Sequence, residues 1–419
     1  MRMIPTVPIE DPHWYLDDPW PTFAAMQREA PFWYYEPLDT FVVTRYEDIK
    51  AIAGRPEIFV NSRALFLNDI RFQAQMGDVT MTDRFFPEGG EQVGTTDPPR
   101  HGELRRVIAP AFSHEALAEL AKPIRQYVDE LLDSIQPGET VDWITYASLV
   151  PIFAGAHLIG VPDVDVDRVR FWSDELEKLG GDLTYEEVEQ AATEMQGLQR
   201  FLAEAVEAKR GTVGGQDLIS VLLAEELDGQ RVSEANILMF CMTMIAAGSD
   251  TTRALLAGLL QQLAKQPGLW KQLRADRSLV RLAVEETLRW VTPARAFVRT
   301  ATEDAVINGH DLRAGQHLYL MYMAANRDER MFARPQDFDV RRPESVRHLA
   351  FGSGAHLCAA ARLVRLEAPI VLNALLDRFS GVTLSEEPTP VVHIIRNGWS
   401  AMPAAFVGQR SRLTTHPSN

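Results

Sequence analysis

Cys358 has the surroundings in this chain that best suit chemistry. It closes the run Phe351-Gly352-Ser353-Gly354-Ala355-His356-Leu357-Cys358, which leads into an Ala-rich stretch of helical character. The two glycines allow a positive φ and a close approach of the backbone to another group. We expect the cysteine at the first turn of a helix, where N–H groups and the helix dipole stabilise a thiolate. Such a cysteine serves as a nucleophile, a metal ligand or an inert buried thiol.

A second candidate site interrupts a long apolar helix that is predicted to follow Ser233. Glycine, hydroxyl and acid side chains in mid-helix are costly for helix propensity. A threonine hydroxyl can bond back to a carbonyl one turn earlier and distort the helix. We expect a groove here that admits O2 and water, and an ordinary polar kink is the alternative. The segment is Ala247-Gly248-Ser249-Asp250-Thr251-Thr252.

Two further groups of charged residues have informative spacing. Glu286 and Arg289 lie three apart on a predicted helix and can pair. On its own, such a pair is commonly solvated and contributes little. A basic group, which with His356 could bind two carboxylates through charge-assisted hydrogen bonds, comprises His101, Arg105 and Arg299.

The spacing Phe351-x-Gly-x-x-His-x-Cys358 resembles the haem-binding signature of the cytochrome P-450 enzymes, the haem-thiolate monooxygenases. The other motifs match in the same order, so the resemblance covers nearly the whole chain. It implies that Cys358 is the axial ligand of the iron of haem b, where thiolate ligation favours O–O cleavage. Ala360 stands where the family usually has glycine, and its methyl group bears on how closely the helix packs against the haem.

The resemblance also implies roles for the other motifs. Asp250 and Thr251 match an acid-alcohol pair that delivers protons when O2 is activated. Glu286 and Arg289 match a structural pair that a third residue, Arg342, joins from a later segment, the meander at 338–342. The haem contacts implied are His101, Arg105, Ala247, Gly248, Arg299, Phe351, Gly352, His356, Cys358 and Ala360.

The predicted substrate pocket is mainly apolar, so a terpenoid, steroid, fatty acid or polyketide-like molecule would fit. Arg295 is expected to share one side of an extended segment with Phe297 and Arg299, because alternate side chains of a strand point the same way. There it would recognise an acidic group on the substrate; an internal ion pair or a solvent-facing side chain are the alternatives. The candidate pocket residues are Phe72, Met76, Phe85, Met244, Arg295, Phe297 and Ile395.

Predicted helix outweighs predicted strand, and the elements do not alternate strictly, which disfavours a doubly wound sheet. The expected fold is mainly α with a smaller β portion. It is a single large α+β domain of the cytochrome P-450 type over residues 1–407, with a polar tail at 408–419. The haem would lie between the long central helix and the helix after Cys358. We expect helices at 22–28, 46–53, 233–265, 278–290 and 358–379, with a kink at Pro369 or a break at Ala368, and strands at 41–44, 296–300, 317–323 and 391–395.

Composition narrows the function classes. The chain has 419 residues, a formal net charge of −16 and two cysteines, Cys241 and Cys358. Such a negative charge disfavours nucleic acid and anionic lipid as partners, and two cysteines make no disulfide framework. The longest apolar run, at 237–247, is too short to span a bilayer. We therefore expect a cytoplasmic protein that binds neither membrane nor nucleic acid.

Electrons must come from outside the chain. It has no Gly-x-Gly-x-x-Gly fingerprint and no cysteine cluster for an iron–sulfur centre. The resemblance implies a ferredoxin and a ferredoxin reductase that draw on NAD(P)H, with O2 as co-substrate. The ferredoxin would dock beside the cysteine loop of a monomeric enzyme, on a basic patch formed by Arg100, Arg106, Arg347 and Arg362; scattered solvated arginines are the alternative.

Three other functions compete with the monooxygenase. A peroxygenase that uses hydrogen peroxide would typically lack the acid-alcohol pair. A haem or ligand-binding protein without catalysis would not need a proton relay. A hydrolase using Cys358 and His356 is disfavoured, because the two residues stand too close in one loop for proton transfer and no orienting residue is evident.

Overall fold

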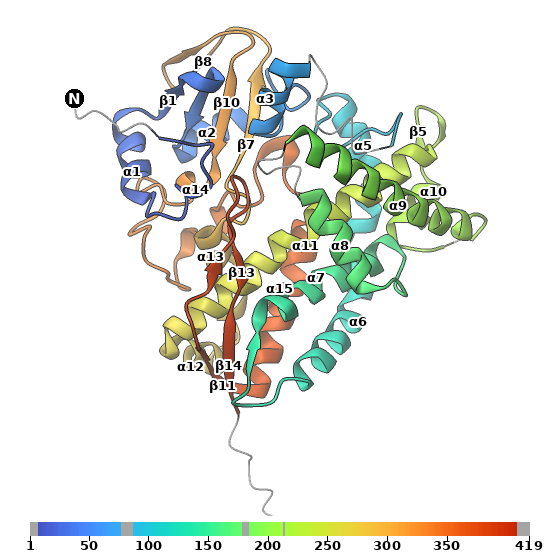
Figure 1. The fold of residues 1–419 in the computed structure, drawn as a ribbon, viewed down its shortest axis with the longest axis vertical. Helices are drawn as coiled ribbons and strands as arrows, with labels where there is room; N and C mark the ends of the chain where they lie inside the picture. Colours follow the sequence, from blue (N-terminus) through green and yellow to red (C-terminus); the bar gives the residue numbers. More distant parts are fainter. Residues whose placement is uncertain (1–6, 77–86, 178–183, 213, 409–419) are drawn as a thin grey trace, which may run out of the picture.

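The computed structural model describes residues 7–76, 87–177, 184–212 and 214–408. A large helical part is joined to a smaller part built around a five-stranded sheet, at the upper left of Figure 1. The predicted mainly α architecture is therefore confirmed. The helices are α1 (Trp20–Glu29), α2 (Tyr46–Ala53), α3 (Leu67–Met76), α5 (Arg100–Ile108), α6 (His114–Asp133), α7 (Trp143–Ile159), α8 (Val166–Glu177), α9 (Tyr185–Lys209), α10 (Leu218–Ala224), α11 (Glu234–Lys265), α12 (Pro267–Ala275), α13 (Leu279–Val291), α14 (Tyr322–Ala325) and α15 (Ala361–Arg378).

The main sheet has the strand order β1-β2-β10-β7-β3. β10 pairs antiparallel with β7 and parallel with β2, so segments distant in the chain share one sheet. The strands are β1 (Phe32–Tyr35), β2 (Thr40–Val43), β3 (Phe59–Val60), β4 (Thr140–Asp142), β5 (Glu226–Leu227), β6 (Gln230–Arg231), β7 (Ala296–Ala301), β8 (Ala305–Ile307), β9 (His310–Leu312), β10 (His317–Met321), β11 (Phe379–Leu384), β12 (Thr389–Pro390), β13 (Trp399–Ala401) and β14 (Pro403–Gly408).

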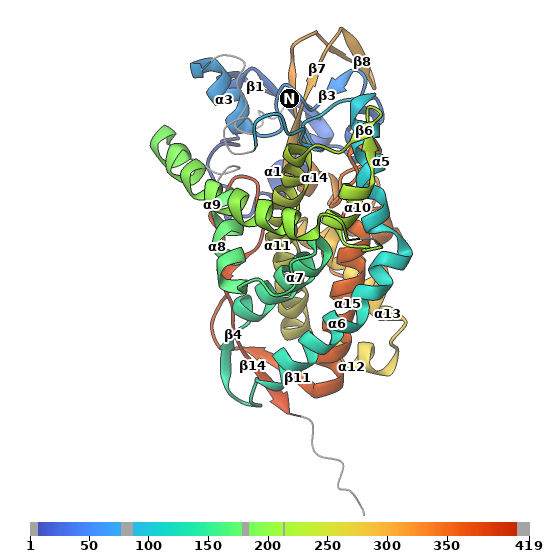
Figure 2. The same cartoon turned by 90° about the vertical axis from the view of Figure 1, so that its right-hand side faces the viewer.

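Helix α11 runs through the middle of the helical part in both cartoon views (Figures 1 and 2). The hydroxyl of Ser233 accepts a hydrogen bond from the Asn236 N–H at 3.2 Å and caps its first turn, as the sequence predicts. Its apolar residues are buried around almost the whole circumference, because α7, α8, α13 and α15 pack around it. This helix is the wall on which the candidate site is built.

The predicted elements differ from the structure at three points near the site. α15 begins at Ala361, so Cys358 lies just before the helix and not in its first turn. The expected strand at 391–395 is wrong: the segment is an irregular connection between β12 and β13. A break at Ala368 is also wrong, because α15 continues through Pro369.

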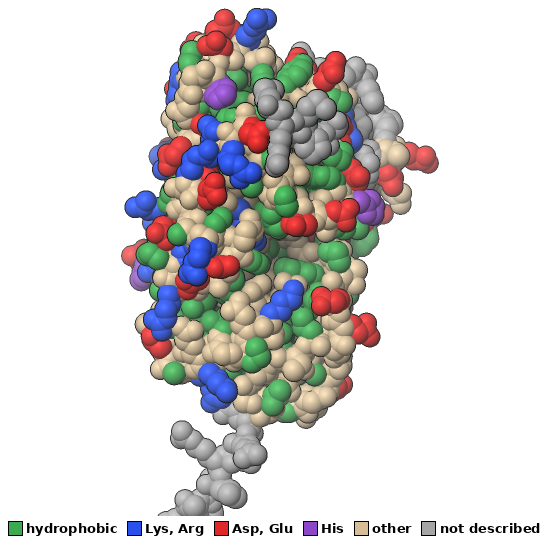
Figure 3. All heavy atoms as spheres, turned by 90° about the vertical axis from the view of Figure 1, so that its left-hand side faces the viewer, with side chains coloured by type: hydrophobic (Ala, Val, Ile, Leu, Met, Phe, Trp, Pro, Cys, Tyr) green, Lys and Arg blue, Asp and Glu red, His purple; other side chains and the backbone are tan. Residues whose placement is uncertain are grey.

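Charge is distributed without a single dominant patch on the face drawn in Figure 3, where basic and acidic side chains are interspersed. Within the described ranges, no helix is both long and apolar enough to cross a membrane. The predicted tail after residue 408 lies outside the described residues.

Candidate active site

A cavity of about 420 Å³ lies between α11 and the loop that carries Cys358. It brings together residues from α5, α11, β7, the cysteine loop and the segment after β12. All ten residues to which the resemblance gives a haem contact line it, as do Asp250 and Thr251. The predicted site residues thus meet in one enclosed space, apart from the exceptions described below.

The cysteine loop has a backbone that requires its glycines. Gly352 and Gly354 both have φ near +71°, a conformation that favours glycine. A Cβ on Gly354 would lie 2.0 Å from the Ala53 carbonyl oxygen, so α2 fixes the loop by close approach. The N–H of Cys358 donates to the Phe351 carbonyl at 2.9 Å and closes the loop. These contacts hold the Cys358 sulfur toward the cavity.

The electrostatics around the Cys358 sulfur act in opposite directions. Enclosure in the protein raises the pKa of the thiol, whereas the N–H groups of Ala360 and Ala361 and the Arg105 guanidinium lower it. Although Cys358 precedes α15, the sulfur accepts hydrogen bonds from the N–H groups that lead into this helix, which is the usual way to stabilise a thiolate. The structure therefore supplies donors for an anionic sulfur.

One end of the cavity holds basic groups that have no anionic partner in the part of the chain that the structure describes. His101 and His356 face each other with ring centroids 4.1 Å apart, and the buried Nε2 atom of each has no hydrogen-bond partner among the described residues. Within the same described set, Arg105 and Arg299 form no ion pair with a carboxylate. Burial and the nearby Arg299, His101 and Arg105 lower the pKa of His356 to about 3. Such a cluster fits a ligand with two carboxylates, as haem has in its propionates.

The polar segment of α11 lines the cavity without ending the helix. The Thr251 hydroxyl donates to the Ala247 carbonyl at 3.1 Å, which is the expected bond to the previous turn. A Cβ on Gly248 would meet no atom within 4 Å, so the space beside this residue is open. A flat cofactor can approach α11 at this point.

Asp250 is held between two arginines. It forms an ion pair with Arg253, one turn along α11, and accepts a hydrogen bond from Arg396 of the segment that precedes β13. Asp250 itself is buried. Neither arginine was predicted from the sequence. Arg396 reaches Asp250 only through the tertiary fold, whereas Arg253 lies one turn away on the same helix.

The predicted placement of Arg295 at the cavity is wrong. Its guanidinium is buried and donates to the carbonyl oxygens of His393 and Arg396, with the Tyr15 ring 5.0 Å from it. β7 begins only at Ala296. Before it, Ala294 pairs with Arg396 in an isolated β-bridge, so Arg295 lies outside the strand. The alternation of side chains therefore does not extend back to Arg295. Carbonyl oxygens and an aromatic ring face its buried charge, although Nε has no hydrogen-bond partner among the described residues.

The other pocket predictions divide into two sets. Met244, Phe297 and Ile395 line the cavity and give it an apolar wall together with Phe66 and Phe240. Phe85 and the side chains of Phe72 and Met76 lie outside the described residues, although α3 includes positions 72 and 76.

The predicted trio meets behind the site. Arg289 forms a bidentate pair with Glu286, at 2.8 and 2.7 Å, and Arg342 donates to the same carboxylate at 3.3 Å. Glu286 and Arg289 are completely buried. Burial raises the pKa of Glu286, but the hydrogen bonds from Arg289 outweigh it and leave the pKa below its ordinary value. Both arginines also donate to the Asp337 carbonyl oxygen, so the trio fixes the meander to α13.

A second network at the same helix was not predicted from the sequence. Glu285, adjacent to Glu286, accepts from Arg365 of α15 at 2.7 and 2.9 Å and contacts His348 at 3.1 Å. The Arg365 guanidinium lies 4.7 Å from the centre of the Phe351 ring. Adjacent residues of a helix point about 100° apart, so two consecutive glutamates hold two different segments. Glu285 thereby ties the cysteine loop and α15 to α13.

A prediction for pH dependence follows from Glu285, whose pKa is lowered to about 2 from its ordinary 4.5 despite burial, because Arg365 and His348 bond to it. A lowered pKa stabilises the folded protein above pH 4.5, and this contribution is lost as the pH falls toward 2. We expect Glu285→Gln to lower the free energy of unfolding by about 3 kcal/mol at pH 7. The difference from wild type should shrink by about 1 kcal/mol at pH 4. Urea unfolding at both pH values measures it, with exposed Glu139→Gln as control; a difference independent of pH would contradict it.

Glu367 is a buried carboxyl group that also lines the cavity and was not predicted from the sequence. Its Oε2 atom has no hydrogen-bond partner within the described ranges. Burial raises its pKa well above the ordinary value, because the charged form loses its hydration. Its position among apolar residues of α15 is the sequence signal that could have indicated a buried acid.

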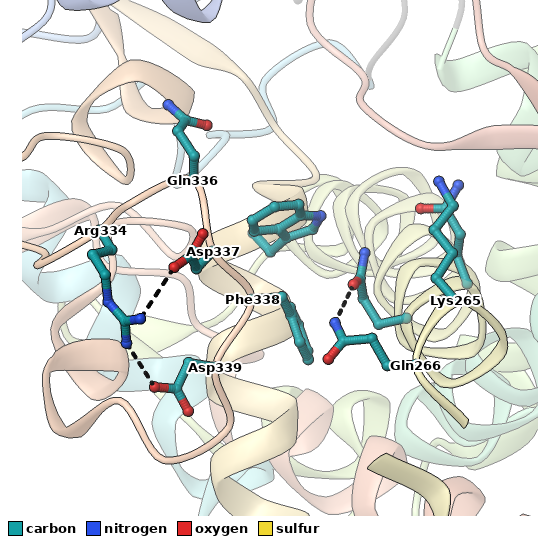
Figure 4. A pocket seen from close by; sticks show the side chains of 10 residues that line it. Lys265, Gln266, Arg334, Gln336, Asp337, Phe338 and Asp339 are labelled. Atoms are coloured by element: carbon teal, nitrogen blue, oxygen red, sulfur yellow. Dashed lines mark hydrogen bonds and ion pairs between the residues drawn. The ribbon is translucent and has the colours of Figure 1, made fainter. Parts of the chain in front are cut away.

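A separate hollow of about 600 Å³ lies at the outer side of the meander, beside the C-terminal end of α11 (Figure 4). Its wall is polar: Arg334 faces Asp337 at 3.4 Å and Asp339 at 3.8 Å. Arg334, Asp337 and Asp339 interact on the meander side of the hollow, and Gln266 bonds to Gln262 on the α11 side (Figure 4). This hollow is distinct from the cavity that contains Cys358.

Ion pairs reduce the positive charge of the arginine patch that was predicted to bind a ferredoxin. Arg100 pairs with Glu91, Glu103 and Asp228, and Arg106 pairs with Glu225. These acids offset both positive charges, so the expectation of a four-arginine patch is wrong. Arg347 and Arg362 are exposed and form no ion pair among the described residues.

Comparisons with known proteins agree with this geometry. The cytochrome P450 family model matches residues 182–394. Putative cytochrome P450 YjiB of Bacillus subtilis (strain 168) is 31% identical, over 86% of this chain and 87% of its own. Nocardicin C N-oxygenase of Nocardia uniformis subsp. tsuyamanensis is 33% identical, over 84% and 85% respectively. The crystal structure of CYP108D1 from Novosphingobium aromaticivorans superposes with a TM-score of 0.84 at 28% identity, covering 96% of this chain and 97% of that one.

The chain therefore belongs to the cytochrome P450 family. It is a cytochrome P450 monooxygenase, an oxidoreductase of the class that carries haem iron.

Proposed function

We propose that this enzyme inserts one atom of O2 into a hydrophobic small molecule, with electrons supplied by separate redox proteins. The observation that carries the proposal is the meeting of three features in one cavity. Cys358 presents its sulfur, the Asp250–Thr251 pair presents acid and alcohol groups, and four basic residues lack carboxylate partners in the described structure. We assign the haem domain to residues 1–407 and treat it as a monomer.

The residues of the cavity fit haem b. Cys358 is the residue that would ligate its iron, and His101, Arg105, Arg299 and His356 would hold its propionates. Bound haem supplies the reductive activation of O2. The uncompensated imidazole and guanidinium groups support this assignment, because two carboxylates would satisfy them.

Asp250 and Thr251 would handle protons on the α11 side of the cavity. The Thr251 hydroxyl lines the cavity and would donate a proton into it when its hydrogen turns away from the Ala247 carbonyl. Asp250, adjacent in sequence, is the acid that resupplies it.

The substrate would bind against an apolar wall. Met244, Phe297 and Ile395, together with Phe66 and Phe240, are lining residues that suit a terpenoid, steroid, fatty acid or polyketide-like molecule.

Electrons would come from a ferredoxin and its reductase fed by NAD(P)H. We expect docking to depend on Arg347 and Arg362, which flank the cysteine loop in sequence and are exposed. The double variant Arg347→Glu/Arg362→Glu should raise the KM for a surrogate ferredoxin roughly 10-fold, because reversed rim charges slow association. Steady-state reduction at varied ferredoxin and salt concentrations measures this. An Arg100→Glu control should have a smaller effect. An unchanged KM in the double variant would contradict a role of Arg347 and Arg362 in docking.

Isotope labelling tests the proposal against the peroxide-using alternative. Purified enzyme with a surrogate ferredoxin, its reductase, NADPH and 18O2 should form a product from a hydrophobic substrate library with one 18O atom per molecule. Products that form only with added hydrogen peroxide would instead support a peroxygenase. Haem binding without any product from either oxidant would support a non-catalytic binding protein.

A further inference from the structure

Arg396 places a positive charge in the apolar part of the cavity wall. It lines the same cavity as Cys358 and Thr251, and its side chain is 28% exposed. Its neighbour in the chain, Ile395, contributes an apolar side chain to the same wall. Arg396 does not belong to the basic group proposed to hold the propionates.

The backbone of Arg396 is fixed on two sides. It forms a bridge with Ala294, and its N–H donates to His393 Nδ1 at 3.0 Å. The buried Arg295 guanidinium donates to the carbonyl oxygens of His393 and Arg396. Arg295, which was expected to face the substrate, thus holds the turn that directs Arg396 toward the cavity.

Asp250 is a partner that the Arg396 side chain can exchange. The Arg396 Nη1 atom donates to Asp250 Oδ2. Asp250 also pairs with Arg253, which is not among the residues that line the cavity. One carboxylate is therefore shared by two guanidinium groups, and Asp250 keeps Arg253 when Arg396 turns toward another anion.

The neighbouring apolar side chains decide which substrates suit this arrangement. A neutral apolar molecule that fills the cavity removes water from the exposed part of Arg396 without offering an acceptor, which is unfavourable. A carboxylate instead forms charge-assisted, commonly bidentate hydrogen bonds with a guanidinium group. The wall formed by Met244, Phe297 and Ile395 would cover the hydrophobic body of the same molecule.

We propose that Arg396 recognises a carboxylate on the substrate by exchanging Asp250 for it, so that the substrates are hydrophobic monocarboxylic acids such as fatty or terpenoid acids. This inference rests on the proposed function, because it names the substrate class of the same site. Arg396 is a specificity-determining residue in this scheme, and Arg295 is a positioning residue.

Matched acids and methyl esters test the exchange. Calorimetric titration of the haem-loaded enzyme with dodecanoic and abietic acids should show at least one acid binding roughly 10- to 100-fold more tightly than its methyl ester. Arg396→Gln should bring that ratio close to one, with ester affinity changed less than about threefold. Arg396→Lys should keep part of the preference, because it keeps the charge.

Two variants separate direct recognition from an effect through Asp250. Arg253→Gln removes the other guanidinium from Asp250 and should weaken the acid preference, because Asp250 would lose its remaining arginine when Arg396 turns to the substrate. Asp250→Asn should tighten acid binding, because it removes the carboxylate that competes for Arg396. These variants and Arg396→Lys also decide the matter if Arg396→Gln does not fold.

Equal affinity of the wild-type enzyme for acid and ester in both pairs, or binding of neither pair, would overturn the inference. A stronger acid preference in Arg253→Gln than in the wild type would do the same. The proposed function fails by different results, namely absence of the thiolate–haem spectrum or of 18O incorporation. The two failures can therefore be told apart.

Discussion

Replacement of Thr251 by alanine is expected to lower product formation on the order of 100-fold or more while O2 consumption continues. Loss of a positioned proton donor typically costs on the order of 10²–10⁴ in the step that it serves. The Thr251 hydroxyl lines the cavity and is held by the Ala247 carbonyl, so its removal takes away a donor at a defined position. Electrons should then appear as hydrogen peroxide. Product, peroxide and NADPH consumption are measured together.

Thr243→Ala provides the matched control for Thr251. Thr243 lies two turns earlier on α11, lines the same cavity and makes the same type of bond, from its hydroxyl to the Met239 carbonyl at 2.8 Å. It has no neighbouring acid in the chain. The ratio of product to NADPH should stay near the wild-type value in Thr243→Ala. If it also stays unchanged in Thr251→Ala, Thr251 has no role in proton delivery.

Replacement of Arg289 by leucine should lower the free energy of unfolding by about 3–5 kcal/mol, because it leaves the Glu286 carboxylate buried without its main partner. The carbonyl oxygens of Asn326, Pro335 and Asp337 lose hydrogen-bond donors at the same time. Urea unfolding followed by circular dichroism measures the change. Haem should also dissociate faster, because the meander is no longer tied to α13.

Arg277→Leu is the control for Arg289. Arg277 forms an ion pair with Asp377 at 2.6 Å, but both side chains are exposed. Exposed pairs contribute at most about 1 kcal/mol. Equal loss of stability in the two variants would show that burial of the Glu286–Arg289 pair has no special effect.

Local sequence signals predicted the elements that carry the site. A serine cap and an apolar run predicted α11, and the structure caps that helix with Ser233. Two glycines predicted a turn of positive φ before Cys358, which Gly352 and Gly354 show. The Glu-x-x-Arg spacing predicted a pair on one helix face, which α13 contains. Each of these features depends on residues a few positions apart.

Contacts between distant segments could not be predicted in the same way. The direction of Arg295 depends on the bridge between Ala294 and Arg396, and hence on the pairing of two segments far apart in the chain. The ion pairs of Arg100 with Glu91 and Asp228 likewise require the tertiary fold. Residue types alone therefore predicted a basic patch and an acid-binding Arg295. In the fold, Arg100 pairs with acids and Arg295 donates to backbone carbonyl oxygens.

The spectrum of the reduced carbon monoxide complex tests the central claim most directly. The wild-type enzyme with haem should show the strongly red-shifted Soret band of thiolate ligation, since the Cys358 sulfur faces the cavity and accepts from the N–H groups of Ala360 and Ala361. Cys358→Ala should lack this band, whereas Cys241→Ala, which removes the other and buried cysteine, should keep it. Persistence of the band in Cys358→Ala, or its absence from the haem-loaded wild type, would contradict the assignment of Cys358 as the haem ligand.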